Sequence, residues 1–407
     1  MNICGFSRVN YWQGIKGGMD LHGKLLSEGM VKRGHNVSII STRHLDGKEH
    51  EERNGVNIYY LKDTVFGSRR KGWRQESVLK FFNLHNKKPF DVIWSQSFDA
   101  FGLINMKKTS LNMPVICTLH GSIQQEFKTF ITNISNNLKK PVKIIESVAG
   151  LFYSYFVVQR SLLSFSDRVI TVSSKVREDI KKWYGREIAD KCVIVPNGID
   201  VSLFKPDLEQ RKSTRQAYGI DERETVLLTL GRLTHEKGHH LAIDALRQLK
   251  TQNMKVRLLI VGTGNYHKSL MEKVKKAALD NEVIFVGFVE NRDTVKYYNS
   301  ADIFLMPTLT VEGLPFVLLE AMSCGKPVIA TYIGGITSAI MNGKNGLLID
   351  AGKCSQITDK IQLLTKNPDL ANSLAESAKR TVHETYSVDM MVDRTLQIMK
   401  TAVLNET

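Results

Sequence analysis

Two glutamates, Glu312 and Glu320, flank a loop and a helix start written EGLPFVLLE. A buried strand expected at 303–306 leads into this loop, and Pro315 stands where proline is favoured at the start of a helix. The backbone amides that follow such a start are free to point at an anion. Because a carboxylate accepts hydrogen bonds from two hydroxyls, Glu320 suits a ribose and Glu312 a hexose. The alternative is that both are helix-terminal charges paired with lysine.

Two cations precede this loop in the sequence. A strand expected to end at Leu230 is followed by Gly231 and Arg232, and Lys237 comes shortly afterwards. Ligands of open α/β sheets bind at the carboxyl ends of the strands, and a guanidinium can hold a phosphate through two hydrogen bonds. These residues therefore favour a phosphate site. The alternative is a pair of solvated loop charges.

The first half of the chain offers two weaker signals. Gly17 and Gly18 lie at an expected turn from strand to helix, where the missing Cβ lets the backbone approach a phosphate. A plain tight turn would explain them equally well. His120 follows another expected strand, and its alternative is a buried histidine with satisfied hydrogen bonds.

Short β-rich runs alternate with amphipathic helical stretches, which predicts parallel sheets with helices on both faces. Leu21, Leu25, Leu26 and Met30 give the first helix, after Gly18. We predict strands at 3–6, 37–42, 92–95, 115–119, 168–172, 193–195, 226–230, 257–261, 283–286, 303–306, 327–330 and 346–349.

The segment at 195–206 is rich in turn formers and separates the two series of strands. We therefore predict an α/β fold with two Rossmann-like domains, residues 1–200 and 201–380. The remaining residues, 381–407, are expected to form a helix that packs back on the first domain.

Charge is unevenly distributed along the chain. The net charge is +15, and residues 1–200 hold 30 Lys and Arg against 18 Asp and Glu. Such a surface favours nucleic acid, anionic lipid or a phosphorylated substrate. No zinc-finger, RNP or helix-turn-helix signature occurs, which disfavours nucleic acid. A basic surface that only aids solubility stays open.

The sequence also argues against a metal site and a membrane-spanning segment. The five cysteines lack the spacing of a zinc site or a disulfide framework, and no Asp-x-Asp pair occurs, so no metal is expected. No apolar stretch reaches the ~18 residues that span a bilayer. The N-terminus lacks the pattern of a signal peptide. These features predict a cytoplasmic protein.

Several ordered motifs resemble those of the GT-B glycosyltransferases, specifically glycosyltransferase family 4. The stretch EGLPFVLLEAMSCGKPVIA is similar to the family's E-x7-E motif. Supporting matches along nearly the whole chain are GGM at 17–19, TLHG around His120, SDRVITVS at 166–173, PNGID from Pro196, GRLTHEKG at 231–238, VGTG from Val261 and VGF from Val286. The resemblance implies two Rossmann-like domains with parallel sheets that face each other across a cleft.

The resemblance also implies roles for the second domain. Arg232 and Lys237 match the basic pair on the donor diphosphate, Glu320 matches the ribose carboxylate, and Glu312 the carboxylate near the donor sugar. Further donor-binding positions are Gly231, Gly262, Gly287, Phe288, Val289, Gly313, Leu314, Pro315 and Phe316. An NAD site at Gly262 and Gly264 is disfavoured, because His267 replaces the third glycine of GxGxxG.

In the first domain, the resemblance implies that Gly17 and Gly18 approach the distal phosphate and that His120 lines the sugar pocket. It implies a retaining transfer from a nucleotide sugar, with UDP favoured and no cofactor or metal. Glu312, His120, Arg232 and Lys237 are the expected catalytic residues. With no nucleophilic carboxylate assigned, transfer would proceed on the front face of the sugar.

The expected acceptor and localisation are inferred from the basic first half of the chain. Residues 67–88 and 138–165 mix cations with aromatic side chains, as an interfacial surface would, although the second segment suits a core helix equally well. We expect a saccharide acceptor, lipid-linked or on a cell surface, and peripheral contact with the inner face of an anionic membrane. The alternatives are a soluble small acceptor, a nucleotide-sugar epimerase or phosphorylase on this fold, and a noncatalytic binding protein.

Overall fold

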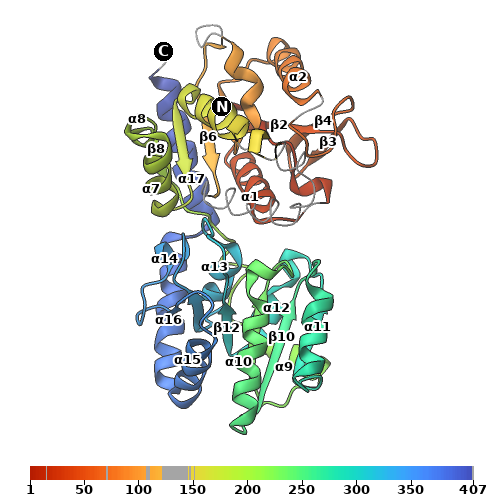
Figure 1. Cartoon of the computed structure of the whole chain (residues 1–407). Coiled ribbons are helices and arrows are strands. Elements are labelled where there is room, and N and C mark those ends of the chain that lie inside the picture. Colours follow the sequence, from red (N-terminus) through yellow and green to blue (C-terminus); the bar gives the residue numbers. More distant parts are fainter. Residues whose placement is uncertain are drawn as a thin grey trace. The chain divides into compact units, whose positions relative to one another are not determined.

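The computed structural model describes residues 1–14, 16–69, 72–106, 111–121, 145, 148–150 and 152–405. The chain forms two compact units (Figure 1). Unit 1 comprises Met1–Gly198 and Val388–Thr407, and unit 2 comprises Ile199–Ser387. Each unit contains one sheet with helices packed on it, as the alternating sequence pattern predicts.

The sheet of unit 1 has 8 strands. In sheet order they are β3 (His50–Arg53), β4 (Val56–Leu61), β2 (Asn36–Thr42), β1 (Asn2–Phe6), β5 (Val92–Gln96), β6 (Val115–Leu119), β7 (Arg168–Thr171) and β8 (Cys192–Ile194). All neighbouring pairs are parallel except β3 and β4. The six strands predicted for this half are present, with ends shifted by a residue or so.

The β3–β4 hairpin corrects the expectation of a purely parallel sheet. Asn54 and Gly55 connect the two strands with φ of 50° and 78°. Asn-Gly is a strong signal for a two-residue hairpin turn, because both residues tolerate positive φ. The Asn-Gly pair thus indicates a hairpin in the sequence. The charged run HEER before it, however, has no alternation of apolar residues that would identify an edge strand.

Helices cover the sheet of unit 1. They are α1 (Gly18–Lys32), α2 (Trp73–Lys87), α6 (Arg160–Phe165), α7 (Ser174–Tyr184), α8 (Arg186–Asp190) and α17 (Val388–Leu404), with 3-10 helices at Tyr11–Gln13 and Asp99–Asn105 and a π-helix at Tyr153–Gln159. The first predicted helix corresponds to α1. Its residues Leu26 and Met30 pack on the strands together with Met391, Val392 and Leu396 of α17.

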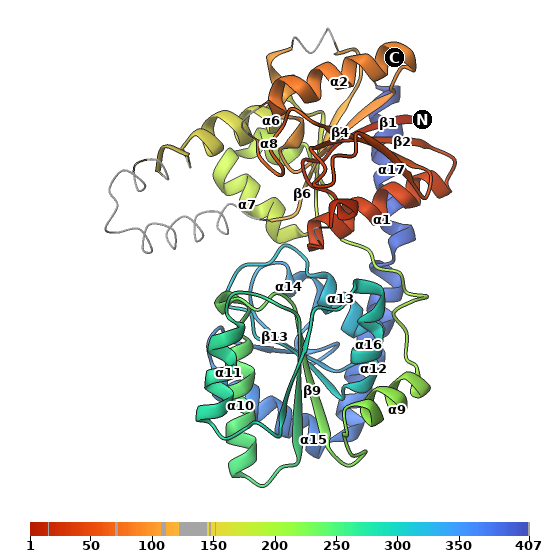
Figure 2. The ribbon, with the colours of Figure 1, turned by 90° about the vertical axis from the view of Figure 1, so that its right-hand side faces the viewer.

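The C-terminal helix α17 lies directly against α1 (Figure 2). A Cβ on Gly29 would come within 2.4 Å of a methyl group of Val392, so glycine allows this close approach. Arg33, at the end of α1, pairs with Asp389 at 2.9 Å and also with Asp393. The tail of the chain is therefore an integral part of unit 1.

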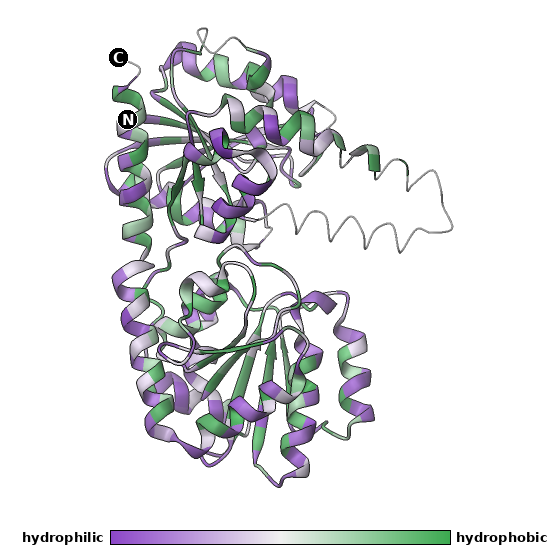
Figure 3. Ribbon diagram, turned by 60° about the vertical axis from the view of Figure 1, so that its left-hand side comes forward, coloured by the Kyte–Doolittle hydropathy of each residue, from purple (hydrophilic) through white to green (hydrophobic). Residues whose placement is uncertain are grey.

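The sheet of unit 2 has 6 strands, all parallel. In sheet order they are β11 (Val283–Gly287), β10 (Val256–Val261), β9 (Thr225–Leu230), β12 (Ile303–Met306), β13 (Val328–Thr331) and β14 (Leu347–Ile349). Figure 3 shows these strands as predominantly hydrophobic, which is typical of a parallel sheet buried on both faces. Each one matches a predicted strand to within about a residue.

Helices lie on both faces of this second sheet (Figure 2). They are α9 (Leu208–Ala217), α10 (His239–Thr251), α11 (His267–Lys276), α12 (Val295–Ser300), α13 (Phe316–Ser323), α14 (Ile336–Ala339), α15 (Cys354–Lys366) and α16 (Pro368–Thr385). The apolar side chains of α10, α11 and α15 form one core cluster with the strands. No helix in the described part of the chain combines the length and apolar character needed to cross a membrane.

The chain passes from one unit to the other at two points. The first, after Gly198, lies within the turn-rich segment 195–206 and close to the predicted boundary at 200. The second lies after Ser387 rather than at residue 381, because α16 continues through that position and packs on α13 and α15 of unit 2. Ile199 donates a backbone hydrogen bond to the carbonyl of Tyr386 at 2.9 Å, which joins the two segments by which the chain passes from one unit to the other.

We predict that Leu396→Ala destabilises unit 1 by about 2–5 kcal/mol, because it leaves a cavity between α17 and the sheet. Leu396 is 4% exposed, whereas Leu404 on the same helix is 73% exposed. Leu404→Ala is the matched control and should change stability by less than about 0.5 kcal/mol. Hydrogen exchange of β1 and β2 amides under native conditions measures the effect. Equal exchange rates in the two variants would show that α17 contributes no stability to unit 1.

Candidate functional site

Three glycine loops follow adjacent strands of unit 2. Gly231 after β9, Gly262 after β10 and Gly287 at the end of β11 have φ of 149°, 134° and 86°. Gly231 donates to the carbonyl of Val261 at 3.0 Å, and Gly262 to the carbonyl of Gly287 at 2.8 Å. These three of the predicted donor-binding glycines thus lie side by side at the carboxyl edge of the sheet.

Glycine is required here because the loops pack through their backbones. A Cβ on Gly262 would lie 1.9 Å from the carbonyl oxygen of Gly231, and one on Gly264 would lie 2.3 Å from that of Leu233. Either side chain would force the β9 and β10 loops apart. Beyond β11, Phe288 is 56% exposed, and Val289 is half-buried. The glycines of the VGTG motif therefore allow close backbone packing, and this packing sets the backbone position of the residue that follows Gly231.

That residue is Arg232, whose side chain is exposed. The guanidinium makes no hydrogen bond or ion pair to any residue that the structure describes. The backbone carbonyl of Arg232, by contrast, is held by the buried His239, whose Nε2 lies 3.1 Å away. Burial lowers the pKa of His239 to about 4, so the ring is neutral and Nε2 donates to the carbonyl. Its Nδ1 then accepts from the hydroxyl of Thr229 at 3.1 Å.

Lys237 and Glu312 form an ion pair, with Nζ and Oε1 at 2.5 Å. The amide of Leu309 donates to the carbonyl of Glu236 at 2.7 Å, which joins the loop that carries Lys237 to the segment that carries Glu312. The carbonyl of Glu312 accepts from the amide of Gly335 at 2.7 Å. The sequence predicted separate ligands for the two charges, but each neutralises the other in this structure. The lysine pairing considered as the alternative thus holds for Glu312.

Glu320 lies in a different environment. It is 1% exposed on α13, where Tyr298 donates to Oε2 at 2.8 Å and Asn291 to Oε1 at 2.7 Å. Burial raises the pKa of Glu320 to about 7. Lysine pairing does not apply to this carboxylate, because its partners are a phenol and an amide. Each of its oxygens keeps a lone pair with which it could accept a hydroxyl.

The helix between the two glutamates starts as predicted. Pro315 caps α13 with φ −72° and ψ 129°, and Phe316 is its first residue. Gly313 and Leu314, in the loop before the helix, are buried. The amides in the first turn of a helix have no acceptor within that helix, and such amides can donate to an anion.

In unit 1, Gly17 caps α1 and Gly18 is its first residue. The Gly17 amide donates to Oδ2 of Asp20 at 3.1 Å. Burial raises the pKa of Asp20 to about 6. A phosphate could use this amide only after the Asp20 carboxylate turns away from it.

His120 follows β6 and is half-buried. Its ring centre lies 4.4 Å from that of His22, and its Nε2 lies 3.0 Å from the side-chain amide nitrogen Nε2 of Gln96. Burial lowers the pKa of His120 to about 4 and holds the pKa of His22 well below its usual value. Both rings are therefore neutral near pH 7 and can exchange hydrogen bonds with hydroxyls but supply no charge.

Comparisons with known proteins cover both units. Residues 16–203 match the family described as Glycosyltransferase Family 4, and residues 210–381 match the one described as Glycosyl transferases group 1. The chain belongs to the group 1/family 4 glycosyltransferases. The transferase has the GT-B fold, with two Rossmann-like units.

Two relatives and one solved structure illustrate the range of the family. Alpha-monoglucosyldiacylglycerol synthase of Streptococcus pneumoniae is 26% identical and covers 92% of this chain and 83% of its own. A GDP-mannose-dependent phosphatidylinositol monomannoside mannosyltransferase of Mycolicibacterium smegmatis is 30% identical over 53% of this chain and 57% of its own. The structure of Anabaena HepE with UDP and glucose has a TM-score of 0.76 at 21% identity, with coverage of 98% and 100%.

Several residues that the sequence did not single out contact predicted site residues of their own unit. Examples are His22, Asp20, His239 and Tyr298. His22 and Asp20 follow the Gly17-Gly18 signal on one turn of α1, and His239 follows the GRLTHEKG motif. Helical spacing from these motifs would have identified the first two. Tyr298 lies on α12, and nothing in the sequence links it to Glu320.

We predict that ionisation of Glu320 lowers the stability of unit 2 as the pH rises. Its folded pKa of about 7 exceeds the ordinary value of 4.5, so folded protein binds the proton more tightly. The stabilisation from this group is complete below about pH 4.5 and is lost as the pH rises to about 7. Glu320→Gln should therefore gain about 2.5 kcal/mol on the wild type between pH 5 and pH 8, at ~1.4 kcal/mol per pKa unit.

Urea unfolding of unit 2 at several pH values measures this difference. Glu376→Gln on α16 is the control, because the Glu376 side chain is 73% exposed. If wild type and Glu320→Gln show the same pH dependence, the raised pKa is wrong.

Proposed function

We propose that the transferase moves a sugar from a UDP-sugar to a saccharide acceptor with retention of anomeric configuration and without a metal ion. The observation that carries this proposal is the exposed Arg232 on the loop after β9, the loop that also carries the paired Lys237, at the carboxyl edge of a parallel sheet. An exposed guanidinium on a backbone held at this edge suits a diphosphate. The nucleotide sugar is a co-substrate, and no cofactor is needed.

Binding of the donor would exchange partners within the ion pair. The diphosphate accepts from Lys237, and a hydroxyl of the donor sugar donates to Glu312. The ion pair thus keeps both side chains extended and charged before the donor arrives, which limits the entropy lost on binding. Glu320 would accept from the ribose while it keeps the hydrogen bonds from Tyr298 and Asn291.

The chemical step follows from the charges available. The bond between the anomeric carbon and the distal phosphate oxygen breaks, and the acceptor oxygen bonds to that carbon on the same face. The acceptor's proton passes to the departing phosphate oxygen. Double displacement needs an unpaired carboxylate beside the anomeric carbon. Glu312 suits that role poorly, because Lys237 holds it at 2.5 Å. Arg232 and Lys237 stabilise the leaving diphosphate in place of a metal ion.

The acceptor is proposed to be a lipid-linked or cell-surface glycan, as in polysaccharide or lipopolysaccharide biosynthesis, reached from the cytoplasmic face of an anionic membrane. The basic first half and the lipid-acting relative from S. pneumoniae support this class. A soluble acceptor is the second candidate, and transfer to water-soluble sugars without lipid would favour it. UDP is proposed over GDP because HepE binds UDP and glucose, although the relative from M. smegmatis uses GDP-mannose.

We predict different roles for the two glutamates. Glu320→Ala should weaken UDP binding by roughly 1–3 kcal/mol, the cost of losing a charged hydrogen-bond partner. Glu312→Ala should spare UDP binding and depress sugar transfer. Calorimetric titration with UDP and GDP measures binding, and Glu236→Ala in the same loop is a control because that side chain is exposed. Equal losses of UDP affinity in both variants, or tighter binding of GDP than UDP, would contradict this assignment.

We predict that transfer persists in EDTA but falls about 10²–10³-fold in Arg232→Ala or Lys237→Ala, the scale for one lost preorganised donor. Arg232→Lys should remain impaired, because ammonium cannot form the two parallel bonds of guanidinium. Turnover is measured with and without EDTA, after circular dichroism has established folding. Arg223→Ala is the control, since Arg223 is exposed in the same unit. Activity abolished by EDTA and restored by Mn²⁺ would refute the proposal.

A further inference from the structure

A glutamine of unit 1 lies against the ring of His120. Gln96 is the last residue of β5, His120 follows β6, and His22 lies on α1. Gln96 and His22 are buried, at 1% and 2% exposed, whereas His120 is half-buried. Three elements that are distant in the sequence thus bring one buried amide and two imidazole rings together.

Packing holds this group of side chains in place. The indole nitrogen of Trp94 donates to the hydroxyl of Thr118 at 3.0 Å, which joins β5 to β6 beside Gln96 and His120. The ring centre of His22 lies 6.4 Å from that of Trp94 and 4.4 Å from that of His120. The planes of the two imidazole rings meet at 71°. These contacts keep α1 and the ends of both strands together around the Gln96 amide.

A backbone carbonyl determines how the Gln96 amide is oriented. Nε2 of Gln96 donates to the carbonyl oxygen of Met19 at 2.8 Å. If the amide were turned over, its own oxygen would face that of Met19, and neither atom could donate. The amide nitrogen therefore lies on this side. The same nitrogen lies 3.0 Å from Nε2 of His120.

The orientation of the amide fixes the proton on His120. Because the amide nitrogen of Gln96 can only donate, Nε2 of His120 accepts and carries a lone pair. Burial lowers the pKa of His120 to about 4, so the ring is neutral and has one proton. That proton is then on Nδ1. Any hydrogen bond from this ring to a ligand uses Nδ1 as the donor.

The other end of the amide is less well satisfied. Oε1 of Gln96 and Nδ1 of His22 are both buried, and neither has an aligned hydrogen-bond partner in the part of the chain that the structure describes. Leaving a buried carbonyl oxygen without a donor is destabilising. Gln96 thus keeps its nitrogen on His120 although its oxygen is unsatisfied. Packing alone does not explain a glutamine here, since an apolar side chain of similar volume would avoid this cost.

We propose that Gln96 is a positioning residue that fixes His120 as a hydrogen-bond donor, so that Nδ1–H of His120 holds a hydroxyl oxygen of the transferred sugar. The ring then takes no proton during transfer, because Nδ1 is protonated and the lone pair of Nε2 is used by Gln96. This inference rests on the proposed function, in which the departing phosphate oxygen takes the acceptor's proton. It adds a fixed polarity to the contact between His120 and the sugar.

Solid-state NMR of the whole transferase, with ¹³C,¹⁵N-labelled histidine, tests the assignment near pH 7. A protonated and an unprotonated imidazole nitrogen resonate far apart, so the spectrum shows the tautomer directly. The signals that disappear in His120→Asn identify the ring of His120. In the wild type, Nδ1 of His120 should be protonated and Nε2 unprotonated. A protonated Nε2 in the wild type overturns the proposal without the use of any Gln96 variant.

Gln96→Met tests whether the glutamine fixes the tautomer. This change keeps a similar volume but removes the donor, so both neutral tautomers of His120 should become populated. Transfer should fall about tenfold, the scale of one hydrogen bond, while UDP affinity changes by less than about twofold. A variant that keeps only the Nδ1–H tautomer would show that Gln96 does not control it. A loss of transfer with an unchanged tautomer would indicate a purely structural role, and either result overturns the proposal.

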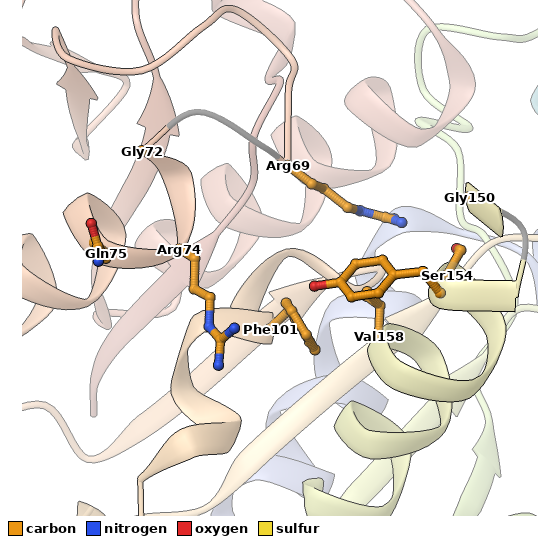
Figure 4. Close-up of a pocket in the computed structure, with 9 residues that line it drawn as sticks. Arg69, Gly72, Arg74, Gln75, Phe101, Gly150, Ser154 and Val158 are labelled. Carbon is orange, nitrogen blue, oxygen red and sulfur yellow. The ribbon is translucent and has the colours of Figure 1, made fainter. Parts of the chain in front are cut away.

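Two other glutamines of unit 1 provide matched controls. Gln13 is 4% exposed and donates Nε2 to the carbonyl of Thr42 at 2.8 Å, so Gln13→Met also removes a buried amide from a backbone carbonyl. Gln75 on α2 is exposed and lines a pocket of about 410 Å³ (Figure 4), whose lining includes neither Gln96 nor His120. Both substitutions should leave the tautomer of His120 as it is in the wild type. A change of tautomer in either control would mean that the effect of Gln96→Met is not specific.

Addition of UDP or UDP-glucose to the wild type tests the sugar contact. UDP-glucose should shift the Nδ1 signal of His120, and UDP alone should leave it unchanged. Equal shifts with both would place the contact on the nucleotide, and no shift with UDP-glucose bound, as calorimetry shows, would remove the contact; each overturns the proposal. Wild type that binds neither ligand contradicts the proposed function, and with it the sugar contact. The tautomer is measured in the free protein and is decided separately from that result.

Discussion

The backbone contact between the β9 and β10 loops constrains the rest of unit 2. With only 1.9 Å between the carbonyl oxygen of Gly231 and the Cβ that any other residue would place at 262, no side chain fits. The contact fixes where the chain leaves β9, and His239 then holds the carbonyl of Arg232. A backbone held in this way limits the positions that the Arg232 side chain can reach, which reduces the entropy that ligand binding would cost.

The Lys237–Glu312 pair gives the site a second property. An unpaired carboxylate at this edge would repel an anionic ligand, and an unpaired ammonium would attract it. Paired at 2.5 Å, they present little net charge, and Arg232 supplies the exposed positive charge. Glu320 is insulated from both by burial and by its neutral partners Tyr298 and Asn291. The two glutamates, which look alike in sequence, therefore have different chemistry.

Unit 1 is also held by a contact between distant segments. The C-terminal helix α17 packs on α1, where Gly29 leaves room for Val392. In the same unit, the buried Arg8–Asp99 pair and the missing side chain at Gly102 hold the 3-10 helix Asp99–Asn105 against the first turn of α2.

Local period and turn signals predicted twelve of the strands and the alternation of strands and helices, and the motif spacing was enough to indicate the family. They also placed Gly231, Arg232 and the following glycine loops at the ends of parallel strands, where ligands of such sheets bind. The sequence could not pair Lys237 with Glu312 or Tyr298 with Glu320, because these contacts join residues 75 and 22 positions apart. The charged β3 strand and the continuation of α16 beyond 381 likewise depended on packing between distant segments. Periodicity reports which face of an element is buried, but only the folded chain decides what lies against that face.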